Sequence, residues 1–143
     1  MGAVLLDTSV LISVLRLGDL TIFSRRRLAG GSRLWLSAVV LEELYAGTSD
    51  VDRHLIERLE KEFDRLDRIL VPTLSDWAQA GRVLSRLAAK HHYEQVGRGR
   101  LTNDALIATS AGRTGTVVVT ENERDFRLLS DFLPFHWQVA AVS

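Results

Sequence analysis

The sequence contains no cysteine, which excludes disulfide bonds and zinc sites with thiolate ligands and is consistent with a reducing compartment. No run approaches the roughly 18 consecutive apolar residues that would span a membrane, and too few apolar residues precede Asp7 to form the core of a signal peptide. Net charge is also absent, because 18 basic side chains offset 18 acidic ones, so no global attraction for nucleic acid is expected. We therefore expect a cytoplasmic protein without a membrane partner.

The sequence does have enough apolar material for one core. It has 143 residues, 46% of them hydrophobic, and no low-complexity tract, linker or internal repeat interrupts it. A chain of this length buries roughly 68 to 70% of the surface that its unfolded form exposes. We expect a single ordered domain over residues 1–143.

Short apolar runs alternate with stretches of helical periodicity. The apolar runs predict strands at residues 4–6, 34–36, 69–71, 117–119 and 137–142. Helices are predicted at residues 8–15, 22–28, 51–66, 75–87 and 105–111, with further helices around Glu43 and from Phe126. This alternation predicts the α/β class, with a three-layer α/β/α sandwich around a mostly parallel sheet of four to five short strands.

Polar residues at the predicted helix starts are the expected N-caps, where a side-chain oxygen accepts a backbone N–H. They are Thr8 and Ser9 for the helix at 8–15, Ser75 and Asp76 for the helix at 75–87, and Thr102 or Asn103 for the helix at 105–111.

Single acidic residues stand where strands give way to helices. Asp7 ends the first strand, Glu43 lies in the helix after the second, and Asp104 opens the helix before the fourth. Asn122 and Asp125 follow the fourth strand. Because the carboxyl ends of parallel strands line a common crevice, these side chains are expected to converge. Convergent carboxylates without histidine or cysteine partners indicate a site for Mg²⁺ or Mn²⁺.

Helical geometry distinguishes the two adjacent acids in the second segment. Val40 and Leu44 define one apolar stripe, which Glu43 flanks, whereas Glu42 points nearly opposite. Glu43 is therefore the inward candidate. The alternative is that both acids are solvated on the helix surface.

Asp104 precedes Ile107, Ala108 and Ala111 at helical spacing, which sets its carboxylate on an apolar face, where a charge needs a partner. The alternative is an acid in the first turn favoured by the helix dipole, worth about 0.3 to 1 kcal/mol. A capping role is the corresponding alternative for Asp7, Asn122 and Asp125. The shared placement of these residues, more than any one of them, indicates a site.

Four segments together resemble a known family. They are residues 6–12, 37–47, 101–108 and 119–126, and they span nearly the whole chain. In this order and spacing they resemble the PIN-domain ribonucleases, and within that family the VapC-type toxins of bacterial and archaeal toxin–antitoxin pairs. The resemblance implies that Asp7, Glu43 and Asp104 bind the metal, supported by the hydroxyls of Thr8, Ser9 and Thr120.

After these three acids, the family pattern has a fourth acidic position, and this chain departs from the pattern there. Many members have aspartate two residues after the threonine, where this chain has Asn122, a neutral oxygen ligand, with Asp125 as the next acid. The resemblance places both residues at the catalytic site and leaves the division of roles between them open.

The implied function is a Mg²⁺- or Mn²⁺-dependent endoribonuclease, the toxin of a type II toxin–antitoxin system, cleaving RNA by metal-activated water. Cations held by carboxylates can stabilise the scissile phosphate and generate a nucleophile near neutral pH. A metal-free mechanism that uses the RNA 2′-hydroxyl would instead require two opposed acid–base groups. The histidines offer no obvious pair, because His91 and His92 are neighbours about 100° apart on a helix and His54 and His136 fall outside the motifs.

Local basic residues must supply the attraction for RNA phosphates. Arg98 and Arg100 lie in a glycine-containing loop close before Asp104 and are the favoured RNA-binding residues. A second candidate is the run at residues 25–27, which is equally well explained as an exposed helix end.

The resemblance also implies a homodimer and a cognate antitoxin, whose C-terminal segment would lie in an apolar groove beside the helix at 51–66. Two other functions stay open. One is a catalytically weakened PIN-like RNA-binding or assembly module, for which Asn122 is the argument. The other is an aspartyl-phosphate phosphotransferase of haloacid-dehalogenase type, which would use Asp7 as nucleophile but needs an acid where this chain has Ser9.

Overall fold

The structure is a computed structural model that describes residues 2–16, 33–91 and 100–140. Its strands form one parallel sheet in the order β3-β2-β1-β4-β5. The strands are β1 (Ala3–Leu6), β2 (Arg33–Ser37), β3 (Ile69–Leu70), β4 (Val117–Thr120) and β5 (Trp137–Val139). The predicted α/β class and parallel sheet are confirmed.

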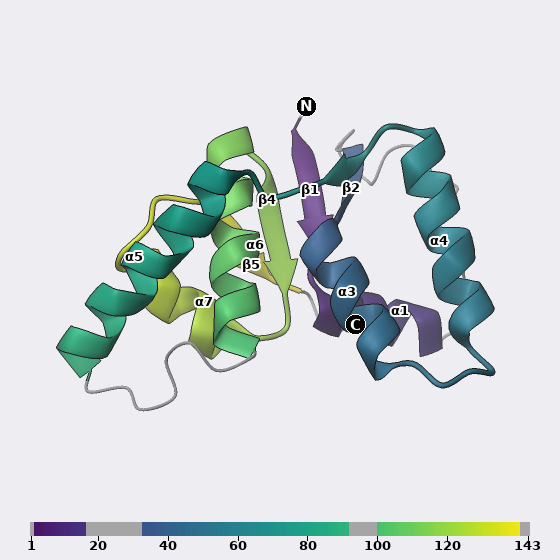
Figure 1. The fold of residues 1–143 in the computed structure, drawn as a ribbon, viewed down its shortest axis with the longest axis horizontal. Helices are drawn as coiled ribbons and strands as arrows, with labels where there is room; N and C mark the ends of the chain where they lie inside the picture. Colours follow the sequence, from purple (N-terminus) through teal and green to yellow (C-terminus); the bar gives the residue numbers. More distant parts are fainter. Residues whose placement is uncertain (1, 17–32, 92–99, 141–143) are drawn as a thin grey trace.

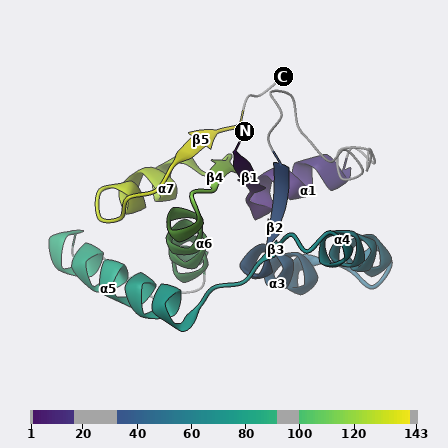
Figure 2. The same ribbon diagram turned by 90° about the horizontal axis from the view of Figure 1, so that it is seen from above.

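Helices cover both faces of this sheet. Figures 1 and 2 show α1, α3 and α4 on one side and α5, α6 and α7 on the other, which makes the predicted three layers. Their bounds are Thr8–Arg16, Ala38–Gly47, Arg53–Arg65, Leu74–His91, Arg100–Thr114 and Glu123–Ser130, in that order. Among the described residues, no helix is long and apolar enough to cross a membrane.

The strand order reverses between β1 and β4. From β1 the chain moves outward to β2 and β3, and it then returns to place β4 and β5 on the other edge of β1. Leu6 pairs with Val119, so β1 and β4 end side by side, and the backbone N–H of Asp7 donates to the Val119 carbonyl at 3.0 Å. In open parallel sheets the crevice at such a reversal is the usual ligand site.

Apolar residues from the strands and from both helix layers form one core. Leu5, Leu36 and Val118 are almost fully buried in the central strands. The helix predicted at residues 51–66 forms as α4 and packs an apolar face inward, where Ile56 and Phe63 are buried. Trp77 of α5 lies outside this core and is 55% exposed.

The N-caps differ from those predicted. Asp7 caps α1, as its alternative interpretation held, because its Oδ1 accepts the backbone N–H of Ser9 at 2.7 Å. The hydroxyls of Thr8 and Ser9 donate to Glu43 and Asp7 and do not cap the helix. At α5 the cap is Thr73: its hydroxyl accepts the Asp76 N–H at 3.1 Å, and Asp76 accepts the Thr73 N–H at 2.9 Å.

The helix that carries Asp104 begins earlier than predicted. Because α6 starts at Arg100, Thr102 and Asn103 lie inside its first turn and cap nothing, and Asp104 stands in the second turn. The helix-dipole explanation of Asp104 is correspondingly weakened, since that effect falls off within the first turn. The helix predicted at 22–28 and the end of the strand predicted at 137–142 lie outside the described residues.

Candidate active site at the ends of the central strands

Asp7 is the buried acid at the strand reversal, with only 4% of its surface exposed. Its Oδ1 accepts from the Ser9 backbone N–H at 2.7 Å and from the Ser9 hydroxyl at 2.5 Å. Its Oδ2 accepts from the Thr120 hydroxyl at 2.5 Å, across the junction of β1 and β4. Each of these donors is neutral, so among the described residues the carboxylate is held firmly without a cationic partner.

Glu43 reaches the same region from α3. Its Oε1 accepts from the Thr8 hydroxyl at 2.6 Å, next to Asp7 in the chain. Glu43 is partly buried and Glu42 is exposed, as the helical geometry predicts. Glu42 instead accepts a long bond of 3.4 Å from Asn103 of α6. The Thr8 contact therefore places Glu43, and not Glu42, beside the end of β1.

Asp104 and Asp125 meet at one side chain. The Asn122 amide donates from Nδ2 to Asp104 Oδ2 at 3.2 Å and to Asp125 Oδ2 at 2.9 Å. Although Asn122 occupies the N-cap position of α7, its side chain makes no cap bond, so capping does not explain it. Asp104 is 4% exposed, which confirms the buried direction expected from the helical spacing.

One chain of hydrogen bonds joins these groups. Thr120 links Asp7 to Asn122, because its hydroxyl donates to Asp7 and accepts from the backbone N–H of Asn122 at 2.8 Å. Ser9 adds a further link by accepting the Glu121 backbone N–H at 3.2 Å. The acids and hydroxyls predicted from the sequence therefore gather at the carboxyl ends of β1 and β4.

The oxygen atoms of these carboxylate, hydroxyl and amide groups are the kind of ligand that a hard divalent cation prefers. The buried Asp7 carboxylate also has no positively charged partner among the described residues. As the side chains lie, however, the described residues contain no group of three or more acidic or histidine side chains arranged to hold a metal ion. The acids hold hydroxyls and an amide instead. A bound cation would have to replace some of these donors.

Several predicted contact residues lie outside the described part of the chain. These are Arg98 and the basic run at 25–27; His92, which was not predicted to be a contact, also lies outside the described residues. Arg100 begins α6, which corrects its predicted loop placement, but its side chain and that of His91 are not described. His54 is exposed, with Nδ1 2.9 Å from the Val51 carbonyl, and is not part of the site.

A cavity of about 580 Å³ opens beside Glu43. It lies between α1, α3 and α4, and its apolar lining comes from Ile12, Leu15, Leu44, Leu55 and Ile56. Arg16 and Asp52 add charge at its wall. The groove that the sequence indicated beside the helix at 51–66 is therefore present, and it adjoins the candidate active site.

Tyr45 ties two walls of this cavity together. Its hydroxyl on α3 donates to Glu60 Oε1 on α4 at 2.6 Å. Burial, followed by the hydrogen bond to Glu60 and the negative charge of Glu60, raises the pKa of Tyr45 to about 12. No sequence pattern indicates this pair, because its members are 15 residues apart on different helices.

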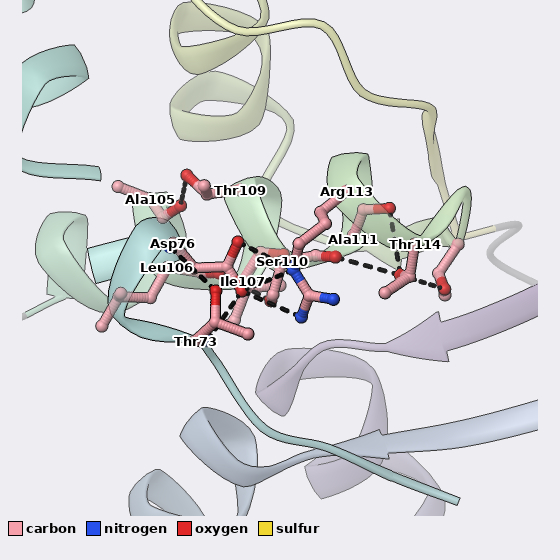
Figure 3. Close-up of polar contacts among 11 residues, drawn as sticks. Thr73, Asp76, Ala105, Leu106, Ile107, Thr109, Ser110, Ala111, Arg113 and Thr114 are labelled. Atoms are coloured by element: carbon pink, nitrogen blue, oxygen red, sulfur yellow. Dashed lines mark hydrogen bonds and ion pairs between the residues drawn. The ribbon is translucent and has the colours of Figure 1, made fainter. Parts of the chain in front are cut away.

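A second buried acid lies outside the site. Asp76 is 2% exposed, and both its carboxylate oxygens accept from Arg113 Nε at 3.0 Å. Figure 3 shows the Arg113 guanidinium of α6 beside Asp76 and Thr73 at the start of α5. This ion pair joins α5 to α6, and no sequence pattern indicates it because the partners are 37 residues apart.

The family model that describes the PIN domain matches residues 4–131, and the chain therefore belongs to the PIN-domain family. PIN domains are generally nucleases, and family membership therefore supports the prediction that this chain is a hydrolase. The resemblance inferred from the four sequence segments is confirmed. No curated protein matches the chain in sequence.

Several solved structures of toxin–antitoxin complexes have a similar fold. The structure of DNA-bound VapBC from Salmonella typhimurium is similar at a TM-score of 0.67 and 27% identity, over 97% of this chain and 98% of that one. FitAcB from Neisseria gonorrhoeae has a TM-score of 0.62 at 23% identity, over 96% of each chain. VapBC2 from Rickettsia felis, bound to a promoter DNA fragment, has a TM-score of 0.58 at 19% identity, over 99% and 100%.

Proposed function

We propose that the chain is a Mg²⁺- or Mn²⁺-dependent endoribonuclease that acts in the cytoplasm as the toxin of a type II toxin–antitoxin pair. The observation that carries the proposal is the buried Asp7 at the strand reversal, linked by hydrogen bonds through Thr120 and Asn122 to Asp104. Glu43 is held next to Asp7 by its hydrogen bond from Thr8, the residue that follows Asp7. Membership of the PIN family and the likeness to VapBC support the same function.

The residues of the chain would orient the reaction. A bound divalent cation would stabilise negative charge on the scissile phosphate and lower the pKa of a water molecule. Asp7, Glu43 and Asp104 are the proposed metal-binding acids. Ser9 and Thr120 fix both oxygens of Asp7, and Thr8 fixes Glu43, so that two of the acids have set directions before substrate arrives.

Cleavage assays with matched variants test this proposal. EDTA should abolish cleavage of RNA, and added Mn²⁺ or Mg²⁺ should restore it. Asp7→Asn and Glu43→Gln should each lose at least about 100-fold in kcat/KM, because even outer-shell partners of a metal site change activity about 10- to 100-fold. Glu42→Gln is the control, since this neighbouring acid is exposed, and it should stay within about threefold of the unmodified protein. Equal losses in Glu42→Gln and Glu43→Gln would remove Glu43 from the site.

Arg98 and Arg100 are proposed to contact RNA phosphates, because both precede Asp104 closely in the chain. Replacing either by glutamine should weaken binding to all RNA sequences alike. It should also lower the salt dependence of the binding constant by about 0.7 per lost contact on a log–log plot. An unchanged slope in both variants would exclude them as phosphate contacts.

The proposed protein partner is a cognate antitoxin whose C-terminal segment lies in the cavity between α1, α3 and α4. Its apolar lining suits aliphatic side chains, and Glu43 at its edge suits a basic side chain of the partner. Leu55→Asp, which places a charge in the lining, should abolish binding of the proposed antitoxin. Val51→Asp is the control, because Val51 is 78% exposed and does not line the cavity.

The proposal includes a homodimer. Leu74 and Trp77 at the start of α5 are 86% and 55% exposed, and neighbours at this spacing share one helix face. Such an exposed apolar surface is typical of an interface. Light scattering should give twice the chain mass, and Trp77→Ser should give the monomer if this face forms the contact.

The second candidate function, a catalytically weakened RNA-binding module, is favoured by one observation. The neutral Asn122 stands between two acids where many family members have a carboxylate. Metal-independent binding of RNA without cleavage would favour this function over the nuclease.

A further inference from the structure

Asn122 holds two carboxylates with one nitrogen atom. Its Nδ2 lies 3.2 Å from Asp104 Oδ2 and 2.9 Å from Asp125 Oδ2. Asp104 belongs to α6 and Asp125 to the first turn of α7. A single amide therefore joins the two helices at the acidic end of the site.

The identity of this residue matters because of its protons. An amide NH₂ has two N–H donors, whereas an ionised carboxylate only accepts. Aspartate in the same place would offer no proton to either neighbour and would add a third negative charge to the group. Only a cation or a proton could then hold the acids together. The amide donates an N–H to each acid.

The same residue is also fixed to the rest of the site. Its backbone N–H donates to the Thr120 hydroxyl at 2.8 Å, and that hydroxyl donates to Asp7 Oδ2. Its side chain makes no N-cap bond to α7. The nitrogen is therefore committed to the two acids, and its backbone sets its distance from Asp7.

We propose that Asn122 is a positioning residue whose NH₂ group keeps Asp104 and Asp125 together in the metal-free protein. The site keeps its shape before metal binds, and it carries one negative charge fewer than it would with aspartate at this position. The cost is a weaker hold on the cation, because a carboxylate attracts a hard cation more strongly than an amide does. This inference rests on the proposed function only for the identity of the ligand, Mg²⁺ or Mn²⁺.

Three variants separate this role from a general structural one. Asn122→Asp removes the donor and adds a charge. Asp125→Asn removes a charge but keeps an oxygen that can accept from Asn122. The double variant Asn122→Asp with Asp125→Asn exchanges amide and carboxylate across the 2.9 Å contact and leaves the net charge unchanged. The exchanged amide at position 125 can donate to the new carboxylate at position 122.

The first measurement is thermal unfolding in EDTA, which needs no metal, RNA or activity. Asn122→Asp should lower Tm by about 5 °C, because hydrogen bonds to charged groups are lost and like charges are left facing one another. Asp125→Asn should stay within about 2 °C of the unmodified protein. The double variant should recover at least half of the loss, which a merely structural defect at position 122 would not allow.

The second measurement is the rise in Tm with added Mn²⁺. Asn122→Asp should reach half of its maximal rise at an Mn²⁺ concentration at least about tenfold lower than the unmodified protein, because the added carboxylate attracts the cation. If Asn122→Asp does not fold in EDTA, the double variant decides alone, since the proposal requires it to fold.

An unchanged Tm in EDTA for Asn122→Asp, or a double variant no more stable than Asn122→Asp, would overturn the proposal. The Tm differences do not depend on whether the protein is a nuclease. Absence of RNA cleavage by the unmodified protein would contradict the proposed function, but the Tm differences would still be expected. Normal metal-dependent cleavage with no Tm differences would defeat only the role of Asn122.

Discussion

The hydroxyl of Thr8 donates to Glu43 Oε1 at 2.6 Å and so joins the first turn of α1 to α3, 35 residues further along the chain. Thr8 follows Asp7 directly, so the bond holds the second acid beside the first. The same contact explains why Thr8 does not cap its own helix. Its hydroxyl is used between elements, and Asp7 provides the cap instead.

Thr8→Val should therefore lower kcat/KM for RNA cleavage by about 10- to 100-fold, as expected when a partner that orients a metal-binding acid is lost. Thr8→Ser keeps a hydroxyl and should stay within about threefold of the unmodified protein. Initial rates at fixed Mn²⁺ compare the two. Equal activity in both variants would mean that this bond does not orient Glu43.

The ion pair shown in Figure 3 should matter more for stability than an ion pair on the surface. Arg113→Ala leaves Asp76, which is 2% exposed, without its counter-ion and should cost about 3 kcal/mol in the free energy of unfolding. Arg65→Ala breaks the exposed pair with Glu62 and should cost less than about 1 kcal/mol. Urea unfolding measures both. Equal costs would show that the Asp76 carboxylate is solvated in solution.

Tyr45 provides a pH-dependent prediction. Its pKa is raised to about 12 by burial and by Glu60, whereas an unfolded tyrosine titrates near 10.0. The folded state holds the proton more tightly, so this contribution to stability is fully present below about pH 10 and is lost as pH rises toward 12. In a Tyr93→Phe background, the absorbance of tyrosinate should show one late transition, and Glu60→Gln should move it to lower pH. A transition near 10 before Glu60 is replaced would contradict the contact.

Thr102 offers a stabilising substitution. Its hydroxyl is buried and has no hydrogen-bond partner among the described residues. Thr102→Val should therefore raise the free energy of unfolding by up to about 1 kcal/mol, because an unsatisfied polar group is removed at constant shape. The control is Thr109→Val in the same helix, whose hydroxyl donates to the Ala105 carbonyl at 2.7 Å, and it should lose about 1 kcal/mol. Destabilisation of similar size in both would mean that Thr102 has a partner in solution.

Local patterns were enough to predict most of the fold. The apolar runs at residues 4–6 and 117–119 became β1 and β4, and the stripe at 51–66 became the inward face of α4. The start of α6 was missed, because Thr102 and Asn103 have good capping side chains although the helix begins at Arg100. Propensity identifies residues able to cap a helix, and tertiary contacts decide which residue does so.

The meeting of these side chains was predictable from the sequence, but their individual hydrogen bonds were not. The rule that parallel strands end together brought Asp7 and the fourth segment to one place, and the register of Leu6 with Val119 agrees with it. The direction of the Asn122 amide depends on two acids from other parts of the fold, Asp104 and Asp125. Such pairings leave no periodic pattern in a sequence.

The chemistry of the RNA ends tests the central claim most directly. Purified protein should cleave a labelled RNA in Mn²⁺ or Mg²⁺ and leave 5′-phosphate and 3′-hydroxyl ends, as expected when a water molecule is the nucleophile. Asp7→Asn prepared in parallel should give no cleavage, which excludes a contaminating ribonuclease. Cleavage that continues in EDTA and leaves 2′,3′-cyclic phosphate would contradict the carboxylate–metal mechanism.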